Sequence, residues 1–342
     1  MLQITAFFQR PQASLCKKLL ESQGLPKKFI LEIIYGNTHG PYPKKGGIMK
    51  LWMIISMAIL ILLCFSLPLL ASEKVVYGED NRLDVIESHN SMHVGLSVST
   101  AGMIDPANLS KASGGYTIVG DTLAQSFSIC PGERFEKQTT VAMCSGFLVG
   151  PDILITAGHC MQDSDNCAKY RWVFNYAEKV GDLPIVVSED DIYNCKEVID
   201  HTVDEETMND YAVVRLDRAV KGRLALKFRT EGKVADNANV MVIGHPSGLP
   251  TKISDGAYVR NNDPLNYFVT NLDTFGGNSG SAVFDSDSGL VEGILVRGEQ
   301  DYEYNEDWTC QRPKKCDMTG CNGEEITRIT SVPNLKKIVG DL

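Results

Sequence analysis

The apolar residues of the chain occur mostly in short runs that are separated by glycine, proline, asparagine and aspartate. Short runs bounded by turn residues are typical of β-strands, whereas a helix shows apolar positions every three or four residues over a longer stretch. The predicted strands are Ser145–Val149, Ile153–Thr156, Tyr211–Leu216, Asn239–Ile243, Tyr267–Thr270, Ser281–Phe284, Leu290–Arg297 and Glu325–Ser331. A short C-terminal helix is expected at Pro333–Val339, with proline in its first turn. The pattern predicts an all-β barrel or sandwich, and roughly 250 residues of short strands can form one domain of two barrels.

One apolar run is much longer than the others and covers Leu51–Ala71. It follows three lysines, contains Pro68 near its end and is followed by the small residue Ser72. These are the parts of a secretory signal peptide. A run of 21 residues could also span a bilayer as an anchor. The proline close to the small residues favours a signal peptide that is cleaved.

A signal peptide normally begins at the start of the chain, but 48 residues precede Met49 here, and they show neither periodicity nor a motif. The run from Lys44 to Met49 can be encoded by purine-rich codons that resemble a bacterial ribosome-binding site just ahead of a start codon. We therefore expect residues 1–48 to be a mis-assigned extension and residues 49–72 to be the signal peptide. The mature protein is then secreted or periplasmic, without stable membrane association after signal cleavage.

The composition is that of a globular protein, because 43% of the 342 residues are hydrophobic and 22% are charged. The formal net charge is -10. The first 72 residues hold eight Lys and Arg and two Glu, which leaves 25 basic and 41 acidic side chains in the remainder. An acidic body of this kind is repelled by phosphate backbones and by anionic lipid headgroups, so the sequence argues against nucleic-acid binding.

Eight cysteines remain once those of the extension and the signal peptide are set aside. They are Cys130, Cys144, Cys160, Cys167, Cys195, Cys310, Cys316 and Cys321. An even number of cysteines in an exported chain predicts up to four disulfides, formed in an oxidising compartment. A zinc site is less well supported, because none of the spacings is C-x-x-C. We expect no metal and no cofactor.

Three stretches carry residues suited to acyl transfer, in the order His, Asp, Ser. His159 lies at the end of a predicted strand in Thr156–Cys160, Asp210 precedes the apolar run Tyr211–Leu216, and Ser279 lies in a glycine-rich turn. A serine hydroxyl is a good nucleophile at neutral pH only when a base takes its proton, and imidazole titrates near that pH. Each stretch alone is weak, but together and in this order they are specific. An α/β-hydrolase would need the order Ser, Asp, His.

At these residues the chain resembles the chymotrypsin-like (trypsin-fold) serine peptidases, and most closely their bacterial glutamyl-endopeptidase-like branch. The resemblance covers about residues 74–342. The family signature T-A-[AG]-H-C is met at Thr156–Cys160, and G-x-S-G is met at Gly277–Gly280. It implies two six-stranded antiparallel β-barrels with the active site between them.

The resemblance also implies roles for individual residues. His159 is expected to be the general base and then the general acid, Asp210 to orient it, and Ser279 to be the nucleophile. The backbone N–H groups of Gly277 and Ser279 match the oxyanion hole.

A disulfide between Cys144 and Cys160 matches the one that brackets the catalytic histidine in this family. For the other cysteines, Cys167 with Cys195 is the nearest sequential choice. Cys130 with one member of the 310–321 cluster would leave the other two to each other.

The specificity pocket is predicted from the same resemblance, at Asp273, Thr274, Leu295, Val296 and Gly298. Asp273 lies six residues before Ser279, where a trypsin-like enzyme carries the aspartate that selects Arg or Lys. The glutamyl-endopeptidase branch instead binds an acidic side chain with a threonine, here Thr274, and with a histidine whose position is occupied by Leu295. In that branch the aspartate need not point into the pocket. The P1 preference stays open, with a slight lean to basic residues or to no sharp preference.

These observations predict a monomeric serine endopeptidase that acts on protein or peptide substrates. Residues 73–115 are expected to be a propeptide or an N-terminal strand region, and residues 116–342 the peptidase domain. Two rival functions are a catalytically inactive binding module on the same fold and an esterase that uses the same triad.

Overall fold

The computed structural model describes residues 75–163, 165–179 and 184–340, all within one unit that spans 71–342. The predicted extension and signal peptide lie outside the described residues. Among the described residues, no helix is long and apolar enough to cross a bilayer.

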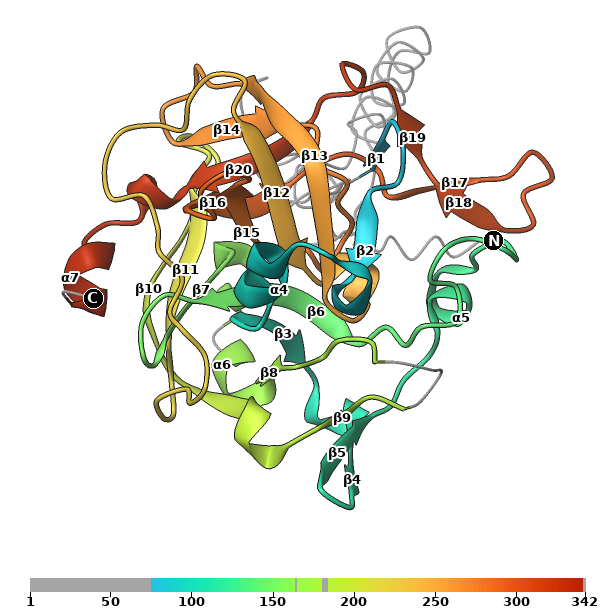
Figure 1. Ribbon diagram of the computed structural model, residues 1–342, viewed down its shortest axis with the longest axis horizontal. Helices are drawn as coiled ribbons and strands as arrows, with labels where there is room; N and C mark the ends of the chain where they lie inside the picture. Colours follow the sequence, from blue (N-terminus) through green and yellow to red (C-terminus); the bar gives the residue numbers. More distant parts are fainter. Residues whose placement is uncertain (1–74, 164, 180–183, 341–342) are drawn as a thin grey trace, which may run out of the picture. The chain divides into compact units, whose positions relative to one another are not determined.

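The first barrel is closed by six antiparallel strands in the order β10, β11, β7, β6, β3, β8 (Figure 1). Its strands are β3 (Thr100–Ile104), β6 (Ala142–Leu148), β7 (Ile153–Thr156), β8 (Arg171–Phe174), β10 (Ile192–Val203) and β11 (Asp210–Leu216). Phe147, Leu154, Trp172 and Val213 are fully or almost fully buried in its core.

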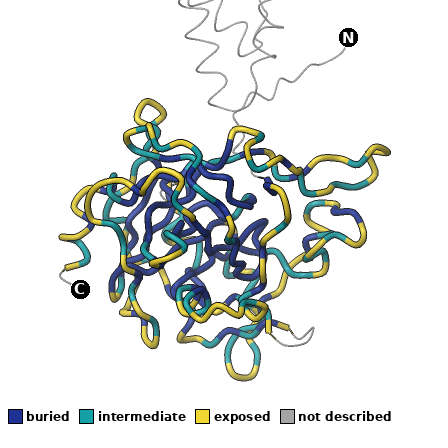
Figure 2. Tube along the Cα trace, turned by 45° about the horizontal axis from the view of Figure 1, so that its top comes forward, coloured by how far each residue is buried: buried dark blue, intermediate teal, exposed yellow. Residues whose placement is uncertain are grey.

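The second barrel has the strand order β12, β15, β16, β20, β14, β13, and it closes through pairing of β12 with β13. Its strands are β12 (Asn239–Gly244), β13 (Lys252–Asn261), β14 (Tyr267–Thr270), β15 (Ala282–Asp285), β16 (Val291–Arg297) and β20 (Glu324–Arg328). The short strand β2 (Arg82–Asp84) pairs with the first residues of β13. Buried residues line the strands of both barrels, whereas exposed ones follow the connecting loops (Figure 2).

The remaining elements are short. The other strands are β1 (Val76–Tyr77), β4 (Leu109–Ala112), β5 (Gly115–Ile118), β9 (Val186–Val187), β17 (Tyr302–Tyr304), β18 (Gln311–Pro313) and β19 (Lys315–Cys316). The α-helices are α4 (Ser91–Ser97), α5 (Leu123–Phe127), α6 (Asn166–Lys169) and α7 (Leu335–Val339). Single 3-10 turns occur at η1 (Val85–Glu87), η2 (Pro106–Asn108), η3 (Gly158–Met161), η4 (Glu189–Asp191), η5 (Pro246–Gly248) and η6 (Ile329–Ser331).

The predicted architecture of two six-stranded barrels and a short C-terminal helix is confirmed, and each of the eight predicted strands overlaps an observed one. The strand predicted at Glu325–Ser331 is longer than the observed strand β20, which ends at Arg328, because Ile329–Ser331 is a 3-10 turn. Four barrel strands were not predicted. Among these, β10 has one buried residue in twelve, and β13 carries lysine, serine, aspartate, glycine and arginine, so neither shows an apolar run.

Residues 75–115 pack against the rest of the domain. Strand β3 is part of the first barrel and β2 extends the sheet of the second, so residues 75–115 belong to the folded domain. Removal of residues 73–115 as a propeptide would take β3 out of the first barrel, so these contacts favour the N-terminal strand region, which stays a prediction.

Four disulfides join the described cysteines. The predicted bonds Cys144–Cys160 and Cys167–Cys195 are both present. Cys130 pairs with Cys310, which leaves Cys316 to pair with Cys321. The Cys144–Cys160 bond closes the hairpin of β6 and β7, which leads directly into the turn that holds His159.

Candidate active site

His159 and Asp210 form a hydrogen-bonded pair on the first barrel. The ring Nδ1 of His159 lies 2.8 Å from Asp210 Oδ2, and the backbone N–H of His159 donates to Oδ1 at 3.0 Å. The carboxylate therefore holds both the imidazole ring and the chain segment that carries it. Asp210 is 3% exposed, whereas about a third of the His159 side chain is open to solvent.

The residues around His159 explain its position. Thr156 ends β7 and its hydroxyl donates to the Ser145 carbonyl on β6 at 2.7 Å. Gly158 lies so close to β10 that an added Cβ would be 2.0 Å from the Thr202 carbonyl oxygen. A side chain at this position would therefore require the His159 turn or β10 to shift. The T-A-G-H-C motif thus has a steric basis in this fold.

Ser279 lies in the loop between β14 and β15 of the second barrel, and Ser145 joins this loop to the first barrel. The Ser145 N–H donates to the Ser279 carbonyl at 2.8 Å, and its hydroxyl donates to the Gly277 carbonyl at 2.8 Å. Cys160 Sγ lies 3.8 Å from the same Ser279 oxygen. Because Cys160 follows His159 directly, these contacts bring Ser279 to the His159 turn.

Two glycines shape the turn around Ser279. Gly277 has φ +86° and Gly280 has φ +87°, a backbone region that side chains rarely adopt. A Cβ on Gly277 would lie 2.5 Å from the His245 carbonyl oxygen, and one on Gly280 would lie 2.2 Å from Thr156 Oγ1. The glycines of G-x-S-G are therefore required by conformation and by close packing. The oxyanion role of the Gly277 and Ser279 N–H groups stays a prediction.

Arg297, at the end of β16, connects the second barrel to Asp210. Its Nη1 lies 3.6 Å from Asp210 Oδ2 and its Nη2 donates to the Met208 carbonyl at 2.9 Å. Its Nε donates to Glu325 at 2.7 Å. Burial alone raises the pKa of Asp210, but the hydrogen bonds and charge of His159, together with the charge of Arg297, outweigh burial and lower this pKa. Asp210 is therefore an ionised carboxylate at neutral pH.

Asp204, the nearest alternative aspartate in the sequence, is engaged elsewhere. Its Oδ1 accepts the backbone N–H groups of Glu206 at 2.8 Å and Thr207 at 3.3 Å, so it caps its own loop. A metal is also disfavoured beside His159. The donor atoms of Cys144, His159 and Cys160 lie within 4.8 Å of one another, but the two sulfurs are bonded to each other and a thiolate is the form that binds zinc.

Asp273 contacts the N-terminal segment of the domain through both of its carboxyl oxygens. Its Oδ1 accepts the N–H of Tyr77 at 2.6 Å and its Oδ2 accepts the N–H of Asn81 at 2.9 Å. The next residue, Thr274, donates its N–H to the Val75 carbonyl at 3.2 Å. Asp273 thus holds the N-terminal segment of the domain against the Ser279 loop. Both oxygens serve a structural purpose, because buried N–H groups of that segment need an acceptor, and this geometry favours the alternative in which Asp273 does not point into the pocket.

The other predicted pocket residues divide into two groups. Leu295 and Val296 are fully buried, Leu295 in the apolar core of the second barrel and Val296 in the cluster that includes the first barrel. Leu295 is therefore a core residue of the second barrel in this structure. Thr274 and Gly298 both lie against the side chain of Glu324, at the start of β20. Glu324 was not among the predicted site residues.

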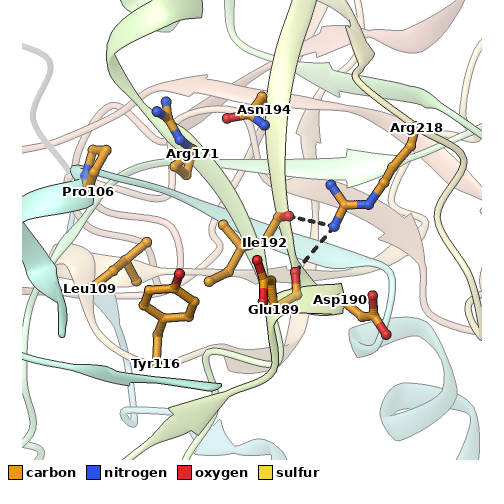
Figure 3. Close-up of a pocket in the computed structure, with 9 residues that line it drawn as sticks. All are labelled: Pro106, Leu109, Tyr116, Arg171, Glu189, Asp190, Ile192, Asn194 and Arg218. Carbon is orange, nitrogen blue, oxygen red and sulfur yellow. Dashed lines mark hydrogen bonds between the residues drawn. The ribbon is translucent and has the colours of Figure 1, made fainter. Parts of the chain in front are cut away.

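A surface cavity of about 490 Å³ lies beside strands β8 and β10 of the first barrel (Figure 3). It is lined by Pro106, Leu109, Tyr116, Arg171, Glu189, Asp190, Ile192, Asn194 and Arg218. The guanidinium of Arg218 is held there by the carbonyls of Glu189 at 3.2 Å and Ile192 at 2.8 Å. None of its lining residues is among those predicted to carry the chemistry.

Part of the chain matches a known protein family. Residues 144–294 match the family model described as a trypsin-like peptidase domain. The chain is similar to the structure of Glu endopeptidase in complex with MPD, at 19% identity over 70% of this chain and 93% of that one, with a TM-score of 0.42. It is also similar to the active form of the Rv3671c protease from M. tuberculosis, at 15% identity over 80% of this chain and 94% of that one, with a TM-score of 0.41. No curated protein sequence matches it. The family match spans His159, Asp210 and Ser279, and the chain therefore carries a trypsin-like peptidase domain.

Proposed function

We propose that this protein is a secreted serine endopeptidase whose triad is His159, Asp210 and Ser279. The observation that carries the proposal is the 2.8 Å contact of His159 with a buried Asp210, next to a loop that presents Ser279. An aspartate on one imidazole nitrogen leaves the other nitrogen to act as a base toward a hydroxyl. The family match of residues 144–294 supports the same reaction class.

In the acylation step, Ser279 Oγ attacks the carbonyl carbon of the scissile peptide and its proton passes to His159 Nε2. The tetrahedral intermediate collapses as the C–N bond breaks, and the imidazolium gives its proton to the leaving amine. Water then attacks the ester on Ser279 as His159 takes its proton. The bond between the acyl carbon and Ser279 Oγ breaks, the imidazolium gives its proton to Oγ, and the free acid leaves. Asp210 stabilises the imidazolium in both steps.

Four disulfides support a location outside the cytoplasm, because bonds of this kind persist in oxidising compartments. The Cys144–Cys160 bond closes a hairpin beside the catalytic histidine. A loop of this length contributes about 3 kcal/mol to stability in the chain-entropy model.

The direct test is Ser279→Ala, assayed for peptide hydrolysis and for labelling by a small serine-directed phosphonate. We expect kcat to fall by on the order of 10⁶ and the label to be absent. The matched control is Ser281→Ala, which removes a hydroxyl two residues away that contacts Asn278. This control should keep the label on Ser279.

Other outcomes would replace the proposal. Hydrolysis that persists in Ser279→Ala would exclude Ser279 as the nucleophile. A native protein that takes no label and cleaves neither peptides nor esters would be an inactive binding module, and one that cleaves simple esters but no peptides would be an esterase.

A further inference from the structure

The connection between β16 and β20 carries a hairpin arm. Strands β17 and β18 pair antiparallel and point away from both barrels (Figure 1). The disulfide Cys130–Cys310 fixes this arm to the segment after α5. Two backbone hydrogen bonds of 2.9 Å add to it, from the Gln311 N–H to the Ser128 carbonyl and from the Cys130 N–H to the Gln311 carbonyl. The arm is therefore firmly held, and we call residues 303–309 the hairpin tip.

The first residues of the arm contact the loop that carries Ser279. Asp301 Oδ2 accepts the Gly276 N–H at 2.8 Å, three residues before Ser279. The ring of Tyr302 packs against Phe275, with the ring centroids 5.2 Å apart. A polypeptide that binds the arm is therefore held on an element that contacts the loop of the proposed nucleophile.

Two aromatic rings are stacked and exposed at the hairpin tip. The ring centroids of Tyr304 and Trp308 are 5.2 Å apart, and the ring planes are inclined by 25°. Tyr304 is 50% exposed and Trp308 is 76% exposed. The hairpin tip thus presents a surface of two rings to solvent.

The backbone of the hairpin tip holds Trp308 in an unusual conformation. Its φ is +55°, in the left-handed region that bulky side chains rarely adopt. The Trp308 N–H donates to the Asn305 carbonyl at 2.9 Å, and Asn305 Oδ1 accepts the Thr309 N–H at 2.8 Å. Such strain persists where neighbouring bonds impose it, and it is concentrated at functional sites. The turn therefore keeps a strained tryptophan in solvent, which packing does not explain.

The rings are flanked by acidic side chains. Glu303, Glu306 and Asp307 are exposed, and within the described part of the chain none of the three is paired with a cation or accepts a hydrogen bond. Residues 303–309 contain no Lys or Arg. Arg312 lies opposite Glu303 in the hairpin, but its Nε is paired with Glu133 at 3.3 Å. The hairpin tip is therefore a negatively charged aromatic surface.

The chemistry of this surface fits a cationic polypeptide. Ammonium and guanidinium groups bind over the faces of indole and phenol rings, and carboxylates attract the same groups. Nucleic acids and anionic lipids are repelled by the three carboxylates. An uncharged ligand that stacks on the rings gains no attraction from them.

We propose that the hairpin tip docks Lys- and Arg-rich segments of polypeptide substrates, through residues other than those at the scissile bond. The docking follows from the rings and the charge of the hairpin tip. That the docked chain is a substrate rests on the proposed peptidase function and on the contact of the arm with the Ser279 loop.

The first test measures binding without cleavage, in the Ser279→Ala background. The probe is a dye-labelled decapeptide of D-lysine and D-arginine with blocked ends, followed by fluorescence anisotropy. We expect binding that weakens with added salt. Trp308→Ala should raise Kd by about tenfold. The triple variant Glu303→Gln, Glu306→Gln, Asp307→Asn should also raise Kd, and it should remove most of the salt dependence.

Matched controls remove exposed side chains of the same kinds elsewhere. Leu265→Ala removes an apolar side chain that is 78% exposed, and Asp287→Asn removes an exposed carboxylate in the turn between β15 and β16. Both should keep the Kd of the background protein. Circular dichroism of each variant checks its folding.

The second test uses the protein with Ser279 intact and one cleavable core peptide, with and without the same D-peptide joined to it by a flexible linker. Because the tail is made of D-residues, it resists cleavage itself. We expect the tail to lower KM by about tenfold and to leave kcat unchanged. Trp308→Ala should abolish this gain and should cleave the untailed core as the native protein does.

Several results would overturn the proposal. Absence of binding to the Ser279→Ala protein does so even if the other variants fail to fold. An unchanged Kd in folded Trp308→Ala and in the folded triple variant would place the binding elsewhere on the acidic surface. Tighter binding of a chito-oligosaccharide, unaffected by the triple variant, would make the hairpin tip a saccharide site.

Failure of the proposed function gives a different result. A protein that binds the D-peptide through the hairpin tip but cleaves neither core peptide keeps the docking site and is not a peptidase. A protein that cleaves the untailed core but gains nothing from the tail is a peptidase whose substrates do not dock on this arm.

Discussion

Asp210 on the first barrel and Asp273 on the second are equally buried, at 3% exposure, yet their environments differ in charge. Asp210 faces an imidazole and the guanidinium of Arg297, and its pKa is lowered in spite of burial. Asp273 faces two backbone N–H groups, and burial raises its pKa to about 7 because those hydrogen bonds only partly offset it. The partner of a buried carboxyl, more than its burial, thus decides whether it is ionised at neutral pH.

The difference matches the two tasks. A carboxylate that must stabilise an imidazolium during each turnover has to carry its charge throughout the working pH range. A carboxyl that only holds the segment at Tyr77 and Asn81 can exchange its proton near neutrality. In the proposed function Asp210 contributes a preset charge, whereas Asp273 is a tether whose strength depends on pH.

The largest expected effect separates the two aspartates by activity. Asp210→Asn keeps the size of the side chain but favours the wrong imidazole tautomer, so we expect kcat to fall by roughly 10⁴. Asp273→Asn should change kcat by less than about tenfold, because Asp273 acts on the loop and touches no reacting group. Steady-state kinetics on one peptide substrate, with circular dichroism as a check of folding, compare them directly. Equal losses in the two folded variants would refute the division of roles.

The second prediction concerns stability. An acid whose pKa is raised on folding binds more protons in the folded state, so its contribution is present at low pH and is lost as pH rises. For Asp273 the window runs from the unfolded value of 3.8 to about 7. Within this pH window, the ionisation of Asp273 should lower the free energy of unfolding by up to about 1.4 kcal/mol for each unit that the pH rises. The slope should disappear in Asp273→Asn.

Urea unfolding between pH 5 and 8 measures this slope, with Ser279→Ala as the common background to prevent self-digestion. His245 contributes with the opposite sign, because burial lowers its pKa to about 4 and its stabilisation is lost as pH falls from 6.5. Subtracting the two curves cancels His245 and leaves Asp273. If the difference curve is flat across this range, Asp273 is already ionised in the folded protein at pH 5.

The sequence predicted the local parts of this site and not the distant ones. His159 and Thr156 lie within one motif, and Gly277, Ser279 and Gly280 within another, so their spacing carries the information. Glu324 meets Thr274 from 50 positions away, and Arg297 meets Met208 from 89 positions away. Those contacts depend on the register of β16 and β20, which neither apolar pattern nor motif specifies. The hydrogen bond between Asp273 and Tyr77 likewise spans 196 positions. The motif around Ser279 holds no information about this partner, so the sequence predicted Asp273 as a pocket residue.

Arg297 allows the smallest and most specific test of the comparison, because its charge helps to lower the pKa of Asp210. Arg297→Gln removes the cation 3.6 Å from Asp210, so the carboxylate holds the imidazolium more strongly. We expect the acid limb of the kcat/KM profile to move to higher pH. A partly exposed pair is worth about 0.2–1 kcal/mol, and at about 1.4 kcal/mol per pH unit this is a shift of about half a unit.

The control for this test is Arg297→Lys, which keeps the charge but not the fork that joins Asp210 to the Met208 carbonyl. If charge is the cause, the lysine variant should keep the native acid limb, and added salt should reduce the difference between it and the glutamine variant. If geometry is the cause, both variants should lose kcat by a similar factor at every pH, with no movement of the limb. That second result would mean that Arg297 acts on the Met208 loop as Asp273 acts on the N-terminal segment, and the contrast between the two aspartates would then rest on His159 alone.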